Sequence, residues 1–176
     1  FFTFFPATVT TTRDSDPITL SASIEGAPLL KHAVTLNEET LLFSDRTQFR
    51  LVSPDVLSPE TVAINVVTHY PLNSDIKPIN NGNNLFFVNA SELASRVYEY
   101  SVDAETSIKT AVDITAHVPR YIPPDVDLMA CSPELNLLVL GSSTKDTSDL
   151  WCYKYYWSGS DKLQSAWFRF TLSGCQ

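Results

Sequence analysis

Cysteine and glycine are scarce in this sequence, which has 3 cysteines and 5 glycines among its 176 residues. Cys131, Cys152 and Cys175 are odd in number and far apart, a pattern that favours free thiols in a reducing compartment over a disulfide framework. We therefore expect all three cysteines to be unbridged. The sequence also lacks any run of 18 apolar residues, so it predicts no membrane-spanning helix.

Signatures of catalysis and of metal binding are missing as well. There is no GxSxG, Walker or GxGxxG motif. No histidine has a cysteine or histidine at metal-ligand spacing; the histidines are His32, His69 and His117. The pairs Asp14/Asp16 and Asp125/Asp127 lack the glycine and distal glutamate of a calcium loop, which favours turn-forming carboxylates. The sequence thus predicts no enzyme, no metal and no cofactor.

Basic residues are fewer than acidic ones. Lysine and arginine number 12 against 20 aspartates and glutamates, which gives a formal net charge of −8 at pH 7. A protein binds the nucleic-acid backbone by neutralising phosphates and releasing their counterions, and an acidic surface gains nothing in this way. The charge therefore argues against nonspecific DNA binding.

Apolar and aromatic residues, in contrast, are plentiful and occur in short alternating runs. The sequence is 44% hydrophobic and 11% aromatic, which argues against disorder, and alternation with period two is typical of strands. The triplets Leu41-Leu42-Phe43, Leu85-Phe86-Phe87 and Leu137-Leu138-Val139 recur at intervals of 44 and 52 residues, close to the length of one propeller blade. We predict an all-β fold of propeller-like blades of antiparallel strands, with a β-sandwich as the alternative.

The repeat divides the predicted strands into three units, with less than about a tenth of the residues in helix. The first unit holds 32–36, 40–45, 47–53 and 61–70; the second holds 76–82, 84–90, 95–102 and a weakly marked strand near 107–118; the third holds 127–133, 136–143 and the hairpin 149–172. Residues 89–94 allow one helical turn. The three prolines of 118–125 favour an extended segment.

The hairpin is the most aromatic part of the chain. Aromatic residues occupy alternate positions from Trp151 to Trp157 and so share one face of the first strand. Such a stripe is more often core or subunit interface than an open surface for stacking sugars or bases. The aromatic residues that we expect in the core or at an interface are Phe43, Phe86, Trp151, Tyr153, Tyr155, Trp157, Trp167 and Phe168.

Four stretches of the sequence together are similar to one protein family. They are FFTFFPATV…RDSDPI (1–18), LLFSDRTQFRL (41–51), DITAHVPRYIP (113–123) and YKYYWSGSDKLQSAWFRF (153–170). In order and spacing they resemble the tail nozzle proteins of short-tailed bacteriophages (podoviruses), also called tail tubular protein B, over nearly the whole chain. Members of that family are several times longer, so the resemblance implies a central piece of a longer polypeptide.

The resemblance implies a structural virion protein with no catalytic residues. It implies a homo-hexameric ring below the tail adaptor ring, with the tail fibres as neighbours, that forms the distal tube for ejection of viral genomic DNA without specific binding. The protein would be assembled in the bacterial host cytoplasm and reside in the virion. Residues 31–176 would form a propeller-like domain of roughly three blades, and residues 1–30 would pack on other parts of the parent protein.

Two groups of residues carry further expectations. The chain begins with phenylalanines that would each gain about 1.5–3 kcal/mol on burial, and we expect them against elements outside residues 1–176 or against a neighbouring chain; they are Phe1, Phe2, Phe4 and Phe5. Candidates for carboxylates that face the lumen of the tube are Glu38, Glu39, Asp103 and Glu105.

Two other functions stay open on the residues alone. One is a carbohydrate-binding or polysaccharide-depolymerising virion domain, in which the aromatic stripe would stack on sugars. The other is a propeller-type interaction module of cellular origin. Glycan binding that is lost when Trp151 or Trp157 is replaced would favour the first, whereas six-fold rings would exclude both.

Overall fold

The computed structural model describes residues 16–18, 28–37, 39–53, 58–72, 75–102, 109–143, 149–159 and 161–172 of the chain. These residues form twelve β-strands, and none of them is helical. The predicted all-β class is confirmed. In the described part of the chain there is accordingly no helix long and apolar enough to cross a membrane.

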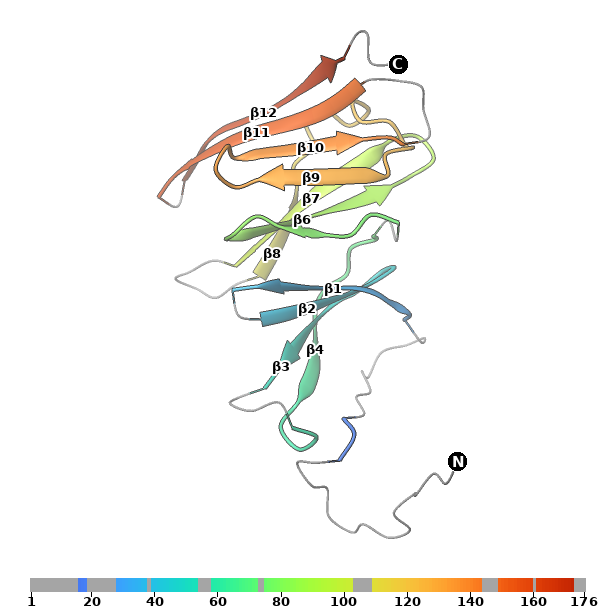
Figure 1. Ribbon diagram of the computed structural model, residues 1–176, viewed down its shortest axis with the longest axis vertical. Helices are drawn as coiled ribbons and strands as arrows, with labels where there is room; N and C mark the ends of the chain where they lie inside the picture. The colour runs from blue at the N-terminus through green and yellow to red at the C-terminus, as the bar shows by residue number, and fades with distance from the viewer. Residues whose placement is uncertain are drawn as a thin grey trace.

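The twelve strands fall into three successive groups of four, and each group forms one antiparallel meander sheet (Figure 1). The first sheet contains β1 (Leu30–Leu36), β2 (Glu39–Ser44), β3 (Gln48–Val52) and β4 (Ala63–Thr68). The second contains β5 (Ile79–Asn80), β6 (Asn84–Ala90), β7 (Ser95–Val102) and β8 (Lys109–Asp113). The third contains β9 (Leu128–Ser132), β10 (Leu137–Gly141), β11 (Asp149–Ser158) and β12 (Asp161–Thr171). This order fits blade-like units and a sandwich alike.

The apolar triplets that define the repeat lie in the second strand of each sheet, which is β2, β6 or β10. A second strand has neighbours on both sides, so its side chains are better covered than those of an edge strand. The weakly marked fourth strand of the second unit is present as β8, and it pairs with β7 from Tyr98↔Asp113 to Val102↔Lys109. The three predicted units therefore correspond to the three sheets.

The helical turn allowed for residues 89–94 does not form. Strand β6 continues through Ala90, and a tight turn follows in which the amide and the hydroxyl of Ser91 both donate to the carbonyl oxygen of Ala94, at 3.0 and 2.8 Å. The hydroxyl stabilises a reversal of the chain, after which Ala90 pairs with Ser95 in the β6–β7 ladder. Serine favours both caps and turns, so its position alone could not separate the two.

The segment 118–125 is not extended as predicted. It continues a series of turns in which the Val118 amide donates to the Thr115 carbonyl oxygen at 2.9 Å and the Tyr121 amide to the Val118 carbonyl oxygen at 3.0 Å. Proline restricts φ to a value that turns share with extended chain, so the three prolines are compatible with either conformation. Local hydrogen bonds select the turns.

The second sheet lies between the other two and is buried on both faces. Along β6, Leu85 and Phe87 pack with residues of the first sheet, whereas Phe86 and Val88 pack with residues of the third. All four side chains are fully buried. Because neither face of this strand meets water, it is a continuous apolar run instead of an alternating one.

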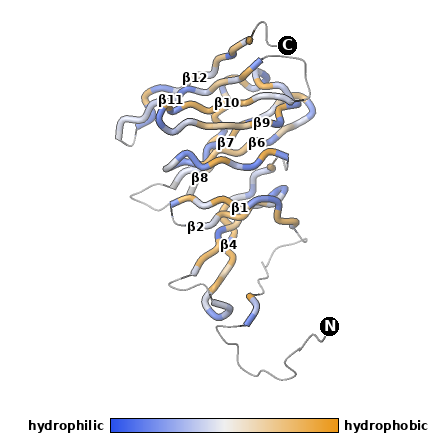
Figure 2. The backbone as a smooth tube through the Cα atoms, viewed as in Figure 1, coloured by the Kyte–Doolittle hydropathy of each residue, from blue (hydrophilic) through white to orange (hydrophobic). Residues whose placement is uncertain are grey.

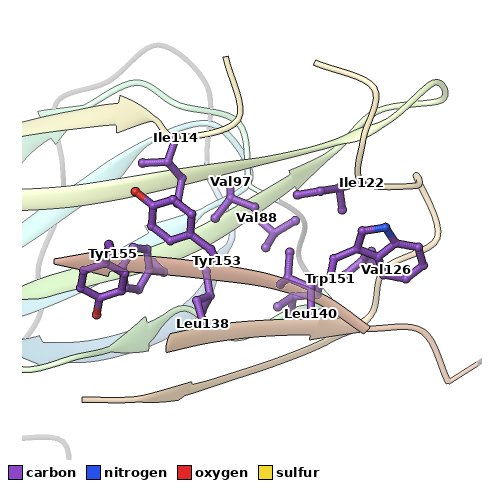
Figure 3. Packing of buried hydrophobic residues seen from close by; sticks show 12 residues of the cluster. Val88, Val97, Ile114, Ile122, Val126, Leu138, Leu140, Trp151, Tyr153 and Tyr155 are labelled. Carbon is purple, nitrogen blue, oxygen red and sulfur yellow. The ribbon is translucent and has the colours of Figure 1, made fainter. Parts of the chain in front are cut away.

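Two hydrophobic clusters fill the spaces between the sheets. In the first, the ring of Phe87 lies 5.7 Å from that of Phe43 on β2 and 5.2 Å from that of Tyr98 on β7. The second joins the second and third sheets, and its members include Phe86, Val88, Val97, Leu138, Leu140, Trp151, Tyr153 and Tyr155 (Figure 3). Hydrophobic residues recur along the strands of all three sheets (Figure 2). Burial of these side chains holds the sheets together as a stack.

The connections between sheets contribute to the same clusters. Leu72 follows β4 and belongs to the first cluster, while Ile76 precedes β5 and belongs to the second. Ile114, Ile122 and Val126, which lie between β8 and β9, also belong to the second cluster. Each connection therefore buries its aliphatic side chains in the interfaces that it passes.

The first strands of the three sheets, β1, β5 and β9, lie side by side. Asn80 joins them, because its Nδ2 donates to the Thr35 carbonyl oxygen of β1 at 2.5 Å and its carbonyl oxygen accepts from Cys131 Sγ of β9 at 3.6 Å. The turn after β5 depends on Gly82, which has φ of +84° and donates its amide to Asn80 Oδ1 at 2.7 Å. One asparagine thus connects all three sheets at this edge.

Replacing Phe86 or Phe87 with alanine should lower the free energy of unfolding by about 3–5 kcal/mol in each case, because each change leaves a cavity in a closed cluster. Tyr156→Ala, at a position 52% exposed, is the control and should change it by less than about 0.5 kcal/mol. Urea denaturation followed by tryptophan fluorescence measures all three. A neutral Phe87→Ala would show that the first sheet is held by other contacts.

Candidate functional site

A charged cluster lies between the second and third sheets. Lys162 of β12 and Glu99 of β7 form an ion pair there, and the rings of Tyr153, Tyr155 and Trp157 of β11 surround the ammonium group. These five residues are called the Lys162 cluster below. Glu99 is only 4% exposed, so water screens this pair much less than it screens a surface pair.

Aromatic rings take the place of part of the hydration shell of Lys162. Its Nζ lies 4.9 Å from the ring centre of Trp157, 5.5 Å from that of Tyr153 and 5.8 Å from that of Tyr155. A cation within about 6 Å of an aromatic face is attracted by the ring quadrupole, with an energy of about 0.5–2 kcal/mol. The aromatic stripe thereby stabilises a charge as well as filling the core.

Both carboxylate oxygens of Glu99 accept hydrogen bonds. Lys162 Nζ donates to Oε2, and Asn84 Nδ2 donates to Oε1 at 2.5 Å. Nζ also donates to Tyr153 Oη at 3.2 Å, and that hydroxyl shares a hydrogen bond with Ser165 Oγ at 3.0 Å. A buried ion pair is tolerated only when such bonds replace lost hydration. The geometry therefore fixes β12 against β7 in one register.

The tyrosine at the edge of the cluster is held in its neutral form. Burial raises the pKa of Tyr155, and the negative charge of Glu99 raises it further. The Tyr155 hydroxyl accepts a hydrogen bond from Asn81 Nδ2 on the turn after β5. This bond is a further connection between the second and third sheets, besides the Lys162–Glu99 ion pair and the bond from Cys131 to Asn80.

The described cysteines, half-buried Cys131 and buried Cys152, form no disulfide. Cys131 and Cys152 are both free, and burial raises the pKa of each. A protonated thiol is a poor nucleophile, so both behave as small apolar side chains. Cys175 lies outside the described residues.

The aromatic residues predicted for the core or an interface occupy three environments. Phe43, Phe86, Trp151, Tyr153 and Tyr155 are buried. Trp157 and Trp167 are half-buried against the second cluster, and Trp167 Nε1 donates to the Ile114 carbonyl oxygen at 2.9 Å. Phe168 lies on the opposite face of β12, across from Cys152 on β11. Because the second sheet covers the stripe, the stripe is not an open surface for stacking sugars.

The candidate carboxylates have structural roles where the structure describes them. Asp127 accepts from the amide of Ser143 at 2.7 Å and from its hydroxyl, and these bonds, the hydroxyl bond most, lower the pKa of Asp127. Glu39 accepts from Arg50 Nη1 at 2.7 Å. Asp125 accepts from the Ser142 hydroxyl at 3.5 Å, and Asp16 is half-buried. The remaining candidates lie outside the described residues; they are Asp14, Glu38, Asp103 and Glu105, together with Phe1, Phe2, Phe4 and Phe5.

No metal centre is formed by the residues that the structure describes. Among them there is no group of three or more histidine, cysteine, aspartate or glutamate side chains able to hold an ion. His69 shares a hydrogen bond of 3.4 Å with Thr47. His117 is exposed in the turns that follow β8, and His32 lies half-buried in β1.

The sequence analysis missed Glu99, Lys162 and Asn80. A signal existed for Glu99, because a charge between Tyr98 and Tyr100 in an apolar strand needs a partner. Lys162 follows a turn, where lysine is ordinary, so the partner could not be recognised from the sequence. Asn80 acts through a spatial neighbour 51 positions away, Cys131, and another 45 positions away, Thr35.

The sequence profile of the bacteriophage nozzle protein family matches residues 1–176. The chain belongs to this family and is accordingly a structural protein of a phage tail. Its similarity extends to a particular curated relative, tail tubular protein gp12 of Escherichia phage T7, with 32% identity over 168 residues. These residues cover 95% of this chain and 21% of the relative, so the chain spans about a fifth of the relative's length.

Among solved structures, the chain is similar to one chain of an S. cerevisiae complex of a Dbp5 variant bound to Nup159, a Gle1 variant, IP6 and ADP. The identity is 14% and the TM-score 0.46, and the match covers 91% of this chain and 35% of that chain.

Lys162→Met should lower the free energy of unfolding by about 3–5 kcal/mol, because it leaves the Glu99 carboxylate buried without its cation. The double variant Lys162→Met/Glu99→Gln should recover most of that loss. Arg169→Met is the matched control: Arg169 Nη1 lies 3.6 Å from Asp149 Oδ2 with a side chain 54% exposed, and its loss should stay within about 1 kcal/mol. Equal effects of Lys162→Met and Arg169→Met would rule out the anchoring role of the cluster.

Tyr100 should make the stability of the protein sensitive to alkali. Burial, and then the charge of Glu39, raise the pKa of Tyr100 to about 12, whereas an unfolded chain ionises near pH 10. This stabilisation is complete below about pH 10 and is lost as the pH rises toward about 12, because the unfolded state ionises first.

Tyr100→Phe should therefore remove about 2 kcal/mol of the alkaline loss of stability. Near neutral pH the substitution should be neutral or stabilising, because the Tyr100 hydroxyl has no hydrogen-bond partner within the described ranges. Urea titrations at a series of alkaline pH values measure both effects. Parallel pH profiles for the two proteins would contradict the assignment to Tyr100.

Proposed function

We propose that the chain is a section of a nozzle subunit, and that six copies of this subunit form the distal tube through which a short-tailed phage ejects its genome. The observation that carries the proposal is the match of the nozzle family to residues 1–176, together with 32% identity to a tail tubular protein. In the virion the ring would lie below the tail adaptor ring and beside the tail fibres, after assembly in the cytoplasm of the bacterial host.

Residues 31–176 would form a propeller-like domain with one blade for each sheet. Two features support this: each sheet is a four-stranded meander, and the first strands β1, β5 and β9 lie side by side, as the inner strands of blades do around a common axis. Residues 1–30 would pack on other parts of the subunit.

The surface charge supports passage of DNA without binding. The chain carries a net charge of −8. Contact between DNA and its surface would therefore release few of the counterions of the DNA, and binding would gain little free energy. Several carboxylates are exposed where the structure describes them, among them Asp45, Glu60, Glu92 and Glu134. A tube lined by such groups would let a polyanion slide, whereas basic walls would retain it.

The proposed role needs no catalytic centre in this part of the subunit. Among the described residues, the three histidines belong to different elements of the fold, and burial raises the pKa of both described thiols. The aromatic stripe that would serve a carbohydrate-binding domain is covered by the second sheet. Assembly and charge are therefore the properties that we assign to this chain.

Negative-stain images of the purified full-length subunit should show six-fold rings, and subunits that stay dispersed would contradict the nozzle assignment.

A second measurement tests the charge. Lysine substitution at an exposed carboxylate that a reconstruction places in the lumen, for example Glu92→Lys, should leave particles assembled but slow DNA ejection, more strongly at low salt because screening is weaker there. The same substitution at a carboxylate on the outside of the tube is the control. Equal ejection rates would show that the sign of the wall charge has no effect.

A further inference from the structure

The third sheet has an apolar face that no described element covers. Its inner face packs on the second sheet through Trp151, Tyr153 and Tyr155. On the other side, called the outer face here, the strand register places apolar residues across all four strands. The residues that define this outer face are Leu128, Val139, Leu150, Cys152, Phe168 and Phe170.

The outer face is apolar like the face of a sheet in a protein core, but no second sheet of the described residues packs on it. Phe168 and Phe170 are in edge-to-face contact with ring centres 5.1 Å apart, and Leu128 and Leu150 both lie close to Gly141. Leu128 is 54% exposed and Phe170 is 52% exposed, whereas Cys152 is 1% exposed and the other three residues of the face are half-buried. A contiguous apolar patch of this kind, which crosses all four strands at one end of the sheet, marks an interaction surface.

In the described part of the chain, the apolar faces of the second sheet are covered by neighbouring sheets. The two faces of the second sheet are each covered by another four-stranded sheet, and each neighbour places its first strand beside the preceding first strand, as β5 lies beside β1 and β9 beside β5. The connection between β8 and β9 buries Ile114, Ile122 and Val126 in the interface that follows it. The outer face is the next position in this series.

We infer that a fourth four-stranded sheet of the same polypeptide covers the outer face. It would be formed by residues that follow residue 176 in the full nozzle subunit, and its first strand would lie beside β9. The inference rests on the proposed function, under which this chain is a section of a longer subunit. The matched relative has room for such a sheet, because the aligned residues cover 21% of it. A tethered sheet also outcompetes a second copy of the chain, since it acts at a high effective concentration.

The test is thiol labelling of the full-length subunit, with Phe170→Cys as the probe and Arg169→Cys as the matched control. The two positions are adjacent on β12 and point to opposite faces, and both residues are exposed in the described part of the chain. Labelling by a maleimide is quantified peptide by peptide with mass spectrometry, so the native cysteines do not interfere. Leu128→Cys, at the other end of the outer face, is a second probe in case Phe170→Cys weakens the fold.

In the monomeric subunit at low concentration, both probes on the outer face should react about tenfold or more slowly than Arg169→Cys, because a covered thiol is labelled only through local opening. Rates equal to that of the control would show that the outer face is open and would overturn the inference. Protection that appears only with rising concentration or in assembled rings would assign the face to a second copy and would overturn it too.

The two proposals fail in different ways. Rings that form normally while Phe170→Cys stays reactive in the monomer would leave the nozzle role standing and remove the fourth sheet. Protected probes in a subunit that never forms rings would keep the fourth sheet and remove the proposed function.

Discussion

Burial of β6 on both faces is the constraint on which the rest of the structure depends. Leu85 and Phe87 belong to one interface and Phe86 and Val88 to the other, so four successive residues serve two cores. A one-residue slip of this strand would move every side chain to the wrong interface. The first and third sheets are therefore coupled to each other through the register of a strand that neither of them contains.

The two interfaces differ in how they specify position. The interface between the first and second sheets is dominated by aromatic and aliphatic contacts such as Phe43 with Phe87, which tolerate small shifts. The interface between the second and third sheets adds the Lys162 cluster, in which an ammonium group meets one carboxylate and three rings. Directional bonds between buried charges cost stability relative to an apolar contact but disfavour alternative alignments. In this chain they fix the sheet that also carries the outer face, which none of the described elements covers.

The fold was predictable from the sequence to the extent that local rules decide it. Period-two alternation and the three apolar triplets located all three sheets, because each sheet is formed by strands that are neighbours in the sequence. Failures arose where chemistry permits two outcomes, as with Ser91 in a turn instead of a helix start. The candidate site was not predictable, since Glu99 and Lys162 are 63 residues apart and meet only when two sheets stack. Likewise, parity alone could not show that Trp167 and not Phe168 shares the face of Tyr153.

The double role of β6 also has a consequence for biosynthesis. Each sheet is built from hairpins between sequence neighbours, so it can form soon after it leaves the ribosome. The face of the second sheet that carries Phe86 and Val88, however, waits for β10 and β11, which follow several seconds later at a translation rate of roughly 5–20 residues per second. During that interval the half-made stack exposes an apolar sheet face to water. The middle sheet therefore passes through an exposed state during synthesis, although the side chains of Phe86 and Val88 are fully buried in the finished fold.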